Sequence, residues 1–378
     1  MRSLVPYAMA LAFTFSVSAQ QGLKCTNGVA GHLEVPYAPA TVPTTGLTLE
    51  AWITYNDATL ISGYVWPTVA RANQSPAQEC YFLRVDASNN STRSLRFKVW
   101  LASNVQLSTV YPFNPGQLLT WTHVAGTYDG QYARLYVNGV QVDISQQASG
   151  PIRDTNGPLR LGKGDDAGAV GAESWNGEID EVRLWPFARS AGEIASTMNT
   201  ELASLPGRVS TWNLNGSPTD SSGALSANSV GTVTFAANSL SLKKVVAAGG
   251  VAFGGSTSTC TALIDTSVTA VPQVGNSAFG LAGYKGPLNG AGALLLSAKG
   301  LTSALTVLSA AIWVDPTAGL VSIPLPTDGL GVCKLNLAIP NNPLLGNGSL
   351  STQFVFVDST CGPKGITASK ALAFSILP

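Results

Sequence analysis

Three carboxylates stand close together in the segment GEIDEVRLW, namely Glu178, Asp180 and Glu181. On a β-strand alternate residues face the same side, so Glu178 and Asp180 share one face and Glu181 takes the other. Carboxylates paired across a cleft are the groups that hydrolyse glycosidic bonds, one as nucleophile and one as acid/base, about 5 Å apart in retaining enzymes. This strand is therefore the first place to look for catalysis.

The sequence contains few residues that could support other mechanisms of hydrolysis. The sequence holds two histidines, His32 and His123, and both stand in runs that are typical of strands. It has no G-x-S-x-G segment near a suitable strand, which would indicate a nucleophilic serine. It also has no C-x-x-C pair or cluster of His with Cys, which would indicate zinc. We predict no catalytic histidine and no zinc site.

Two aromatic residues, Tyr64 and Trp66, lie in a loop-like stretch that ends at Pro67. Ligand sites commonly combine aromatic side chains with a few well-placed polar groups. We take Tyr64 and Trp66 as the candidate ligand-binding residues, for a sugar in particular. The competing interpretation is that Trp66 packs onto the body of the domain.

The five cysteines indicate disulfides and one remaining thiol, if the protein is exported. Locality is the only guide to their pairing. Cys333 and Cys361 belong to one C-terminal segment and are predicted to pair. Cys25 and Cys80 belong to one N-terminal region and are the second predicted pair, which leaves Cys260 free.

The N-terminus has the pattern of a secretory signal. Arg2 precedes the apolar run Leu4–Val17, and small residues follow up to Ala19, after which we place the cleavage. The other long apolar stretch, Ala291–Val314, contains a lysine and scattered Ser and Thr and is interpreted as core strands. We therefore expect a secreted protein, extracellular or at the cell surface, with no membrane span after the signal is removed.

Composition narrows the class of fold and of partner. Of 378 residues 11% are charged, and 21 Lys and Arg balance 21 Asp and Glu. A neutral, weakly charged chain lacks the basic surface that nucleic acids require, so we expect no nucleic-acid partner. With 39 Gly and 22 Pro, the composition favours β-structure with many turns over helical repeats.

The clearest local pattern is in Thr120–Asp143. Its two runs of β-forming residues are broken by Asp129-Gly130 and Asn138-Gly139, dipeptides that suit tight hairpin turns. Alternation between the turns predicts an antiparallel meander with one buried face. Tyr81–Asp86 and Leu95–Leu101 predict a further hairpin.

One helix is predicted after these strands. Ser190 and Glu193 have the spacing of a capping box, in which each side chain binds a free backbone N–H group. Ile194, Met198 and Leu202 follow at helical spacing, so the pattern predicts about three turns packed on the sheets.

Four blocks together resemble a known family. W-x-H-V-A-x-T-Y-D-G and R-L-Y-V-N-G-V in Thr120–Asp143 resemble the laminin G-like jelly roll of the concanavalin A-like lectin/glucanase class. Leu47–Ile53, Leu159–Gly162 and Trp175–Trp185 resemble its other core strands, in the same order. The resemblance implies a β-sandwich, and a fold of this kind hosts many activities.

The resemblance also bears on catalysis. Glucanases of this fold carry a third carboxylate two or three residues after the aspartate, and Val182 and Arg183 stand there instead. IDEVRLW is similar to the corresponding strand of non-catalytic laminin G-like domains. The resemblance therefore implies a protein that is not an enzyme.

A calcium ion often joins the opening and closing strands of this family. By resemblance, Asp180 would supply its carboxylate, and Asn27 and Gly28 its backbone carbonyls. This chain departs from the family where acidic residues are usual, having Ala30-Gly31. The alternative is that Asp180 only hydrogen-bonds to the neighbouring turn.

We thus expect an all-β protein: a concanavalin A-like jelly roll with one short helix over residues 20–238, after a signal peptide over 1–19. A linker over 239–257 leads to a smaller β-sandwich over 258–378, which resembles a C-terminal domain of bacterial exported proteins. The first hypothesis for function is non-catalytic binding of carbohydrate or another cell-surface ligand. The others are a structural or adhesion component of the cell envelope and, last, a glycan hydrolase.

Overall fold

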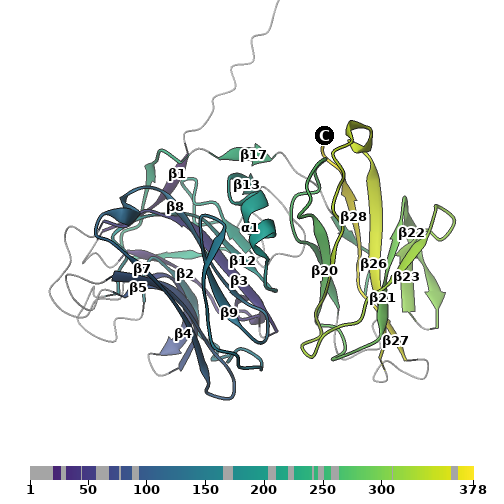
Figure 1. Cartoon of the computed structure of the whole chain (residues 1–378), viewed down its shortest axis with the longest axis horizontal. Coiled ribbons are helices and arrows are strands. Elements are labelled where there is room, and N and C mark those ends of the chain that lie inside the picture. The colour runs from purple at the N-terminus through teal and green to yellow at the C-terminus, as the bar shows by residue number, and fades with distance from the viewer. Residues whose placement is uncertain are drawn as a thin grey trace, which may run out of the picture.

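A computed structural model gives the chain two β-rich lobes, an N-terminal and a C-terminal one (Figure 1). Among the described residues, no helix is long and apolar enough to cross a membrane. The structure describes residues 20–26, 31–43, 45–56, 68–75, 78–86, 93–164, 173–202, 210–219, 225–240, 242–245, 251–256, 264–308, 310–358 and 365–378.

The N-terminal lobe is a sandwich of two antiparallel sheets, as predicted. The first sheet has the order β10-β9-β8-β3-β12-β1-β16, and β14 pairs with β12. Its strands are β1 Gln21–Cys25, β3 Leu47–Ile53, β8 Thr122–Tyr128, β9 Ala133–Val137, β10 Val140–Ile144, β12 Gly177–Trp185, β14 Ser210–Trp212 and β16 Thr234–Ala237.

The second sheet has the order β15-β2-β11-β4-β5-β6-β7. Its strands are β2 His32–Val35, β4 Thr68–Ser75, β5 Gln78–Asp86, β6 Arg93–Trp100, β7 Gln106–Phe113, β11 Leu159–Leu161 and β15 Asn228–Val230. Short 3-10 turns lie at Pro39–Thr41 and Gln117–Leu119. The predicted hairpin is the β5–β6 pair.

The two sheets enclose one hydrophobic core. Along β6, Leu95, Phe97 and Val99 face inward and alternate with polar residues that face outward. Gly126 of β8 lies opposite Phe97, and a Cβ atom there would sit 2.1 Å from the phenylalanine ring. This glycine is required because the ring from the second sheet presses directly on the backbone of the first.

The predicted meander is formed by β8, β9 and β10. Its turns use the expected residues: φ is 92° at Gly130, 49° at Asn138 and 78° at Gly139. Asn138 also accepts a hydrogen bond from the backbone N–H of His123 at 2.9 Å. The local sequence therefore fixes both turn geometry and strand register here.

The helix α1, Ala191–Thr197, begins as predicted and ends early. Ser190 and Glu193 form the capping box, with bonds of 3.3 and 2.6 Å. The expected third turn is wrong, because Leu202 lies in a short strand, β13 Thr200–Leu202, instead. The backbone carbonyls of Thr197 and Thr200 accept hydrogen bonds from the buried guanidinium group of Arg183, so the backbone does not continue as a helix.

Strand β12 carries a bulge that the alternating pattern did not predict. Asp180 pairs with Trp52 and Arg183 with Glu50, so two residues of β12 stand opposite a single residue of β3. The first of them, Glu181, has a φ of 50°, which is uncommon for a residue with a side chain. Beyond the bulge, the alternation of inward-facing and outward-facing side chains along β12 is shifted by one residue.

The C-terminal lobe is built from smaller sheets. Its larger sheet has the order β18-β28-β26-β21-β24, with β27 on β26, and a three-stranded sheet has the order β19-β20-β25. The strands are β18 Val251–Phe253, β19 Asp265–Val268, β20 Gly280–Tyr284, β21 Gly292–Ser297, β24 Val321–Pro324, β25 Cys333–Asn336, β26 Ser349–Val357, β27 Ile366–Ala368 and β28 Ala371–Ser375. A hairpin of β22 Gly300–Val307 and β23 Ala310–Val314 and a 3-10 turn at Pro343–Leu345 complete it.

The segment between the lobes contains strands. Within 239–257, β17 Lys243–Val245 pairs in parallel with β13, and β18 pairs with β28. The low-complexity sequence that predicted a linker there thus contributes an edge strand to the C-terminal sheet.

The two lobes share a hydrophobic cluster. Trp185, Phe187 and Leu202 of the jelly roll pack with the core residues of the C-terminal lobe, Tyr284 among them. Helix α1 lies on this same side of the jelly roll (Figure 1). The part of the first sheet around Trp185 and α1 is therefore covered, whereas its strands β1 and β10 keep exposed residues. The second sheet is turned away from the C-terminal lobe (Figure 1).

Candidate functional site

The outer face of the second sheet carries a row of polar side chains around an aromatic centre. Strand register brings one residue from each of six neighbouring strands into line across the sheet. In order across the sheet they are Glu34, Arg160, Arg71, Phe82, Lys98 and Ser108. We call this set, with the adjacent Arg84, Asp86, Arg96 and Trp100, the outer-face site.

Ion pairs hold most of the charges of the outer-face site in place. Arg71 is buried and donates to Glu173 at 2.7 Å and to Glu79 at 2.5 Å. Arg160 donates to Glu34 at 3.1 Å. The planar guanidinium groups are therefore oriented before any ligand arrives.

Asp86 orients two further guanidinium groups. Arg84 donates to one of its oxygens at 2.7 Å, and Nε of Arg96 lies 2.7 Å from the other. Burial lowers the pKa of Arg84, although Asp86 acts in the opposite direction. Arg84 stays charged at neutral pH, since a guanidinium group does not lose its proton in proteins.

The centre of the site is a pair of rings covered by cations. Phe82 and Trp100 lie 5.4 Å apart, tilted by 58°. The guanidinium carbon of Arg84 lies 4.0 Å from the centre of the Phe82 ring, and Nζ of Lys98 lies 5.1 Å from that of Trp100. These contacts are cation–π interactions, which fix the long side chains above the rings.

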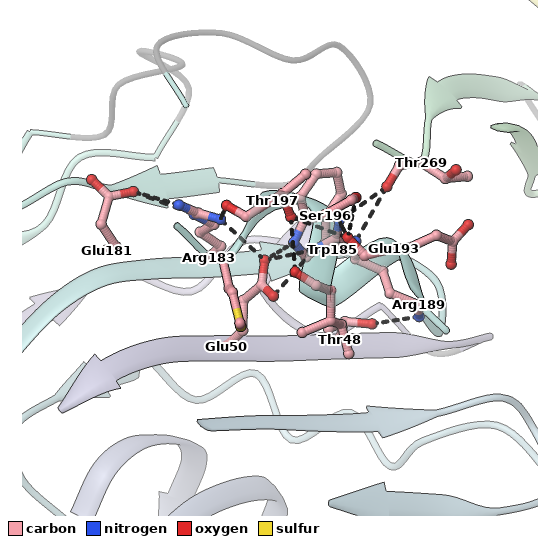
Figure 2. Close-up of polar contacts among 12 residues, drawn as sticks. Thr48, Glu50, Glu181, Arg183, Trp185, Arg189, Glu193, Ser196, Thr197 and Thr269 are labelled. Carbon is pink, nitrogen blue, oxygen red and sulfur yellow. Dashed lines mark hydrogen bonds and ion pairs between the residues drawn. The ribbon is translucent and has the colours of Figure 1, made fainter. Parts of the chain in front are cut away.

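A second charged cluster, which we call the sealed cluster, lies on the first sheet, and its charged side chains are buried (Figure 2). At its centre the fully buried Glu50 of β3 accepts hydrogen bonds from Arg189 at 2.9 and 3.1 Å and from the Trp185 indole at 2.8 Å. Arg183 approaches the same carboxylate to 3.7 Å. Burial acts to raise the pKa of Glu50, but Arg189 and Arg183 outweigh it and hold the pKa below its usual range.

The cluster extends along β12 and β8. Arg183 donates to Glu181 at 2.8 Å, and Asn213 donates to the other oxygen of Glu181 at 2.5 Å. Nε2 of His123 lies 3.7 Å from Glu50, and burial lowers the pKa of His123 to about 4. With a neutral histidine, two carboxylates balance two guanidinium groups.

The sealed cluster reaches into the C-terminal lobe. Arg189 donates to the carbonyl of Thr269 at 3.1 and 3.3 Å. Nearby, Lys334 donates to Glu193 of α1 and to the carbonyl of Ala188, each at 2.9 Å. Because its groups are buried, the cluster is not accessible to a substrate. Its hydrogen bonds hold the two lobes together.

Asp180, the predicted calcium ligand, lies next to this cluster in a polar niche. Its carboxylate accepts hydrogen bonds from Gln20 at 3.1 Å, from Asn238 at 3.0 Å and from the backbone N–H of Glu181 at 2.8 Å. Burial, with the nearby Glu181, raises the pKa of Asp180 to about 8. Within the described part of the chain, no three His, Cys, Asp or Glu residues gather as a metal cluster would require.

Several predicted site residues lie outside the described residues: Asn27, Gly28, Tyr64 and Trp66. The roles assigned to them stay predictions. The outer-face site was missed in the sequence, although alternation along 93–100 points Lys98 and Trp100 to one face. The signal in the sequence is the basic residue Lys98, two positions before Trp100 on the same face.

The predicted Cys25–Cys80 disulfide is not formed. Both thiols are buried and free, and they belong to different sheets, in β1 and β5. Cys80 lies 3.1 Å from the hydroxyl of Thr155, and burial raises the pKa of Cys25 to about 12. Cys333 is also a buried free thiol, and its predicted partner, Cys361, lies outside the described residues, as does Cys260.

A cleft of about 470 Å³ lies where the two lobes meet, lined in part by Phe187 and Lys334. Its two carboxylates are already engaged by their own loops. Asp129 accepts hydrogen bonds from the backbone N–H groups of residues 131 and 132, and Asp328 accepts them from those of residues 330 and 332.

Comparison with known families agrees with this architecture. The model of the concanavalin A-like lectin/glucanases superfamily matches residues 27–195, which cover most of the strands of both sheets. Over these residues the jelly roll is similar to that superfamily. The matched region includes the whole row of the outer-face site and the central part of the sealed cluster.

Curated relatives share a short segment with this chain. Human pappalysin-1 is 39% identical and mouse pappalysin-1 is 38% identical, each over 90 residues. The match covers 23% of this chain and only 5% of each pappalysin. The similarity therefore concerns part of one domain.

Solved structures that are similar to this chain include two jelly-roll proteins. A protein of Bacteroides ovatus assigned to carbohydrate binding has 18% identity and a TM-score of 0.45, covering 58% of this chain and 60% of the other. The pentraxin of Limulus polyphemus, described as SAP-like, has 17% identity and a TM-score of 0.40, covering 60% of this chain and 99% of the other.

Proposed function

We propose that this protein is a non-catalytic binding module that recognises carbohydrate through the outer-face site. The observation that carries the proposal is the row of pre-oriented polar side chains, from Glu34 to Ser108, on the face of the second sheet that is turned away from the first. Charged side chains that are fixed by ion pairs can bind the hydroxyl groups of a sugar without first losing conformational freedom. The concanavalin A-like fold of the domain is compatible with this role.

The absence of a catalytic role is part of the proposal. Of the three carboxylates on β12, Glu181 is engaged by Arg183 and Asn213, and Asp180 is engaged by two amides. Glu178 is half-buried and faces Lys24 of the neighbouring strand. A retaining glycosidase needs two carboxylates free to act about 5 Å apart, an arrangement that these bonds oppose.

A glycan array tests the proposed function. The full chain, without its signal segment, is applied to the array and its folding is checked by near-UV circular dichroism. We expect binding to at least one class of glycan, with no release of reducing sugar on prolonged incubation. Failure of the folded protein to bind any glycan would favour the alternative, a structural or adhesion component of the cell envelope. Release of sugar would restore the hydrolase hypothesis.

We also propose a structural calcium ion at Asp180. Asp180 supplies the carboxylate, and Asn27 and Gly28, whose backbone carbonyls are the other predicted ligands, lie outside the described residues. Gln20 and Asn238 turn amide N–H groups toward Asp180, so a bound calcium ion would replace these two hydrogen bonds. Calcium would keep this buried carboxylate ionised at a pH where its pKa of about 8 otherwise favours the neutral form. The expected result is that calcium raises the Tm of the wild type over that in chelator, and leaves the Tm of Asp180→Asn unchanged. An equal rise in both proteins would exclude Asp180 as a ligand.

An extracellular location completes the proposal. Its support is the N-terminal pattern of the sequence, with a basic residue, an apolar run and small residues up to Ala19. Expression of the full chain, followed by N-terminal sequencing of the protein in the medium, tests it. We expect the mature protein to begin at Gln20; retention of the intact chain in the cells would contradict secretion.

A further inference from the structure

The charges of the outer-face site do not cancel. Arg71 is paired with Glu79 and Glu173, and Arg160 with Glu34. Arg84 and Arg96 share Asp86. Lys98, in the middle of the site, makes no ion pair with any described residue, so it is the cation of this site that has no paired carboxylate there.

The surroundings of Lys98 make an unpaired charge costly. The side chain is half-buried, and its Nζ lies 5.1 Å from the ring of Trp100 and 5.7 Å from that of Phe82. Burial lowers the pKa of Lys98, and the like charge of Arg84 lowers it further, while the more distant carboxylates of Glu79 and Asp86 act in the opposite direction without outweighing them. The rings offset part of this cost but bring no negative charge.

Two residues with hydrogen-bond donors, Ser108 and Arg96, lie close to Lys98 in the sheet. Ser108 pairs with Lys98 across β7, and Phe82 pairs with it across β5. Arg96 precedes it by two residues on β6 and therefore faces the same way. An anion placed here would meet an ammonium group, a hydroxyl group and a guanidinium group, which are the donors that bind carboxylates and sulfates strongly.

We infer that the glycan taken by the outer-face site is acidic, and that Lys98 binds its carboxylate or sulfate group. This inference rests on the proposed carbohydrate-binding function and adds the charge of the ligand to it. A neutral sugar can accept hydrogen bonds from the donors of the site, but it leaves the ammonium group of Lys98 without a directly paired negative charge. An acidic sugar supplies both, so the site discriminates in favour of the anion.

Matched pairs of polysaccharides test the inference. Polygalacturonate is compared with its methyl ester, and dextran sulfate with dextran, by affinity electrophoresis of the full chain. The members of each pair differ in charge and share a backbone. The two acidic polymers distinguish a carboxylate ligand from a sulfate ligand.

Three variants locate the effect. Lys98→Gln removes the charge, Lys98→Arg keeps it, and Lys24→Gln removes the charge of an exposed lysine on the first sheet. We expect Lys98→Gln to weaken binding of the acidic polymer about tenfold or more. Lys98→Arg should retain most of the binding, and Lys24→Gln should match the wild type.

The outcomes separate the two claims. Equal binding of acidic and neutral polymers, or binding of the acidic polymer that Lys98→Gln leaves unchanged, would overturn the inference and keep the proposed function. No binding to any polymer or to the array would overturn both. A loss of affinity as large in Lys24→Gln as in Lys98→Gln would show non-specific charge attraction and would also overturn the inference.

Discussion

The buried charge of Glu50 bears on whether the surface around it, on the first sheet, can bind a ligand. Glu50 lies in the middle of β3 with no exposed surface, and Arg189 and Arg183 balance its charge. Taking three charged groups out of water is unfavourable unless each finds its partner. The cluster is therefore stable only where other parts of the protein cover the first sheet around Glu50. This covered part of the sheet is not available to a ligand.

We predict that Glu50→Gln destabilises the protein by about 3–5 kcal/mol, because it leaves two buried guanidinium groups facing a neutral amide. Urea unfolding followed by tryptophan fluorescence measures the change. The matched control is Glu34→Gln, which removes a carboxylate from a partly exposed pair with Arg160 and should cost less than about 1 kcal/mol. Equal effects of the two substitutions would contradict the account of the cluster.

His123 predicts how stability depends on pH. The pKa of the folded state is about 4, below the ordinary 6.5, so the unfolded chain binds the extra proton between these values. Stability is therefore complete above pH 6.5 and falls as the pH is lowered toward 4, by about 3 kcal/mol at most. Denaturant unfolding at pH 7, 6 and 5 measures the slope. His123→Gln should flatten it, and a slope that persists in this variant would assign the effect to other groups.

Little of the sealed cluster could be predicted from the sequence. Glu50 stands at an outward position of Leu47–Ile53, where a strand pattern expects a solvated residue. Its partner Arg189 is 139 residues away in sequence, in a segment with no strand or helix pattern of its own. Only the approach of β12 and β3 in the folded chain brings the two together.

At the scale of elements, α1 links the jelly roll to its neighbour. Ile194 packs against Ala125 and Tyr136 of the first sheet, and Glu193 binds Lys334 of the C-terminal lobe. The helix has only seven residues, so its caps account for a large share of its stability. The same Glu193 side chain also serves the capping box at Ser190.

We predict that Ser190→Ala lowers the stability by about 1 kcal/mol, since it removes the hydroxyl group that satisfies a free N–H of the first turn. Thermal unfolding followed by circular dichroism provides the measurement. Ser196→Ala, an exposed position on the same helix, should change the stability by less than about 0.5 kcal/mol. A larger loss in Ser196→Ala than in Ser190→Ala would be inconsistent with the cap.

The elements themselves were more accessible from the sequence than the contacts between them. The Asp-Gly and Asn-Gly turns and the capping box were predicted because their geometry depends on residues within a few positions. The bulge at Glu181 was not, because its positive φ is imposed by the partners Arg183 and Asn213 and not by a glycine. The length of α1 was overestimated for the same reason, since Arg183 draws the chain away from the helix.

At the scale of the molecule, the two lobes form one unit. The interface combines the apolar side chains of Trp185, Phe187 and Leu202 with the buried bonds of Arg189 and Lys334. An interface of this kind couples the unfolding of its two sides, because separating them exposes both apolar and charged groups. The C-terminal lobe thus serves to cover part of the first sheet, whatever else it does.

The wild type should therefore unfold in a single calorimetric transition, and Phe187→Ala should separate it into two. The substitution removes a ring from the interface at a cost of about 3–5 kcal/mol. Phe97→Ala, which removes a ring from the core of the jelly roll, is the control and should lower the Tm without disconnecting the lobes. Two transitions in the wild type would contradict the coupling of the lobes.

The central claim is that ligands bind the outer face of the second sheet, and one comparison of affinities tests it most directly. Ser108→Trp places a bulky ring beside Lys98 without disturbing the core, and Gln141→Trp places the same ring at an exposed position on β10 of the first sheet. Titration calorimetry with the strongest glycan from the array gives both affinities. We predict that Ser108→Trp weakens binding about tenfold or more while Gln141→Trp equals the wild type. Unchanged affinity in a folded Ser108→Trp protein would place the ligand elsewhere and contradict the account.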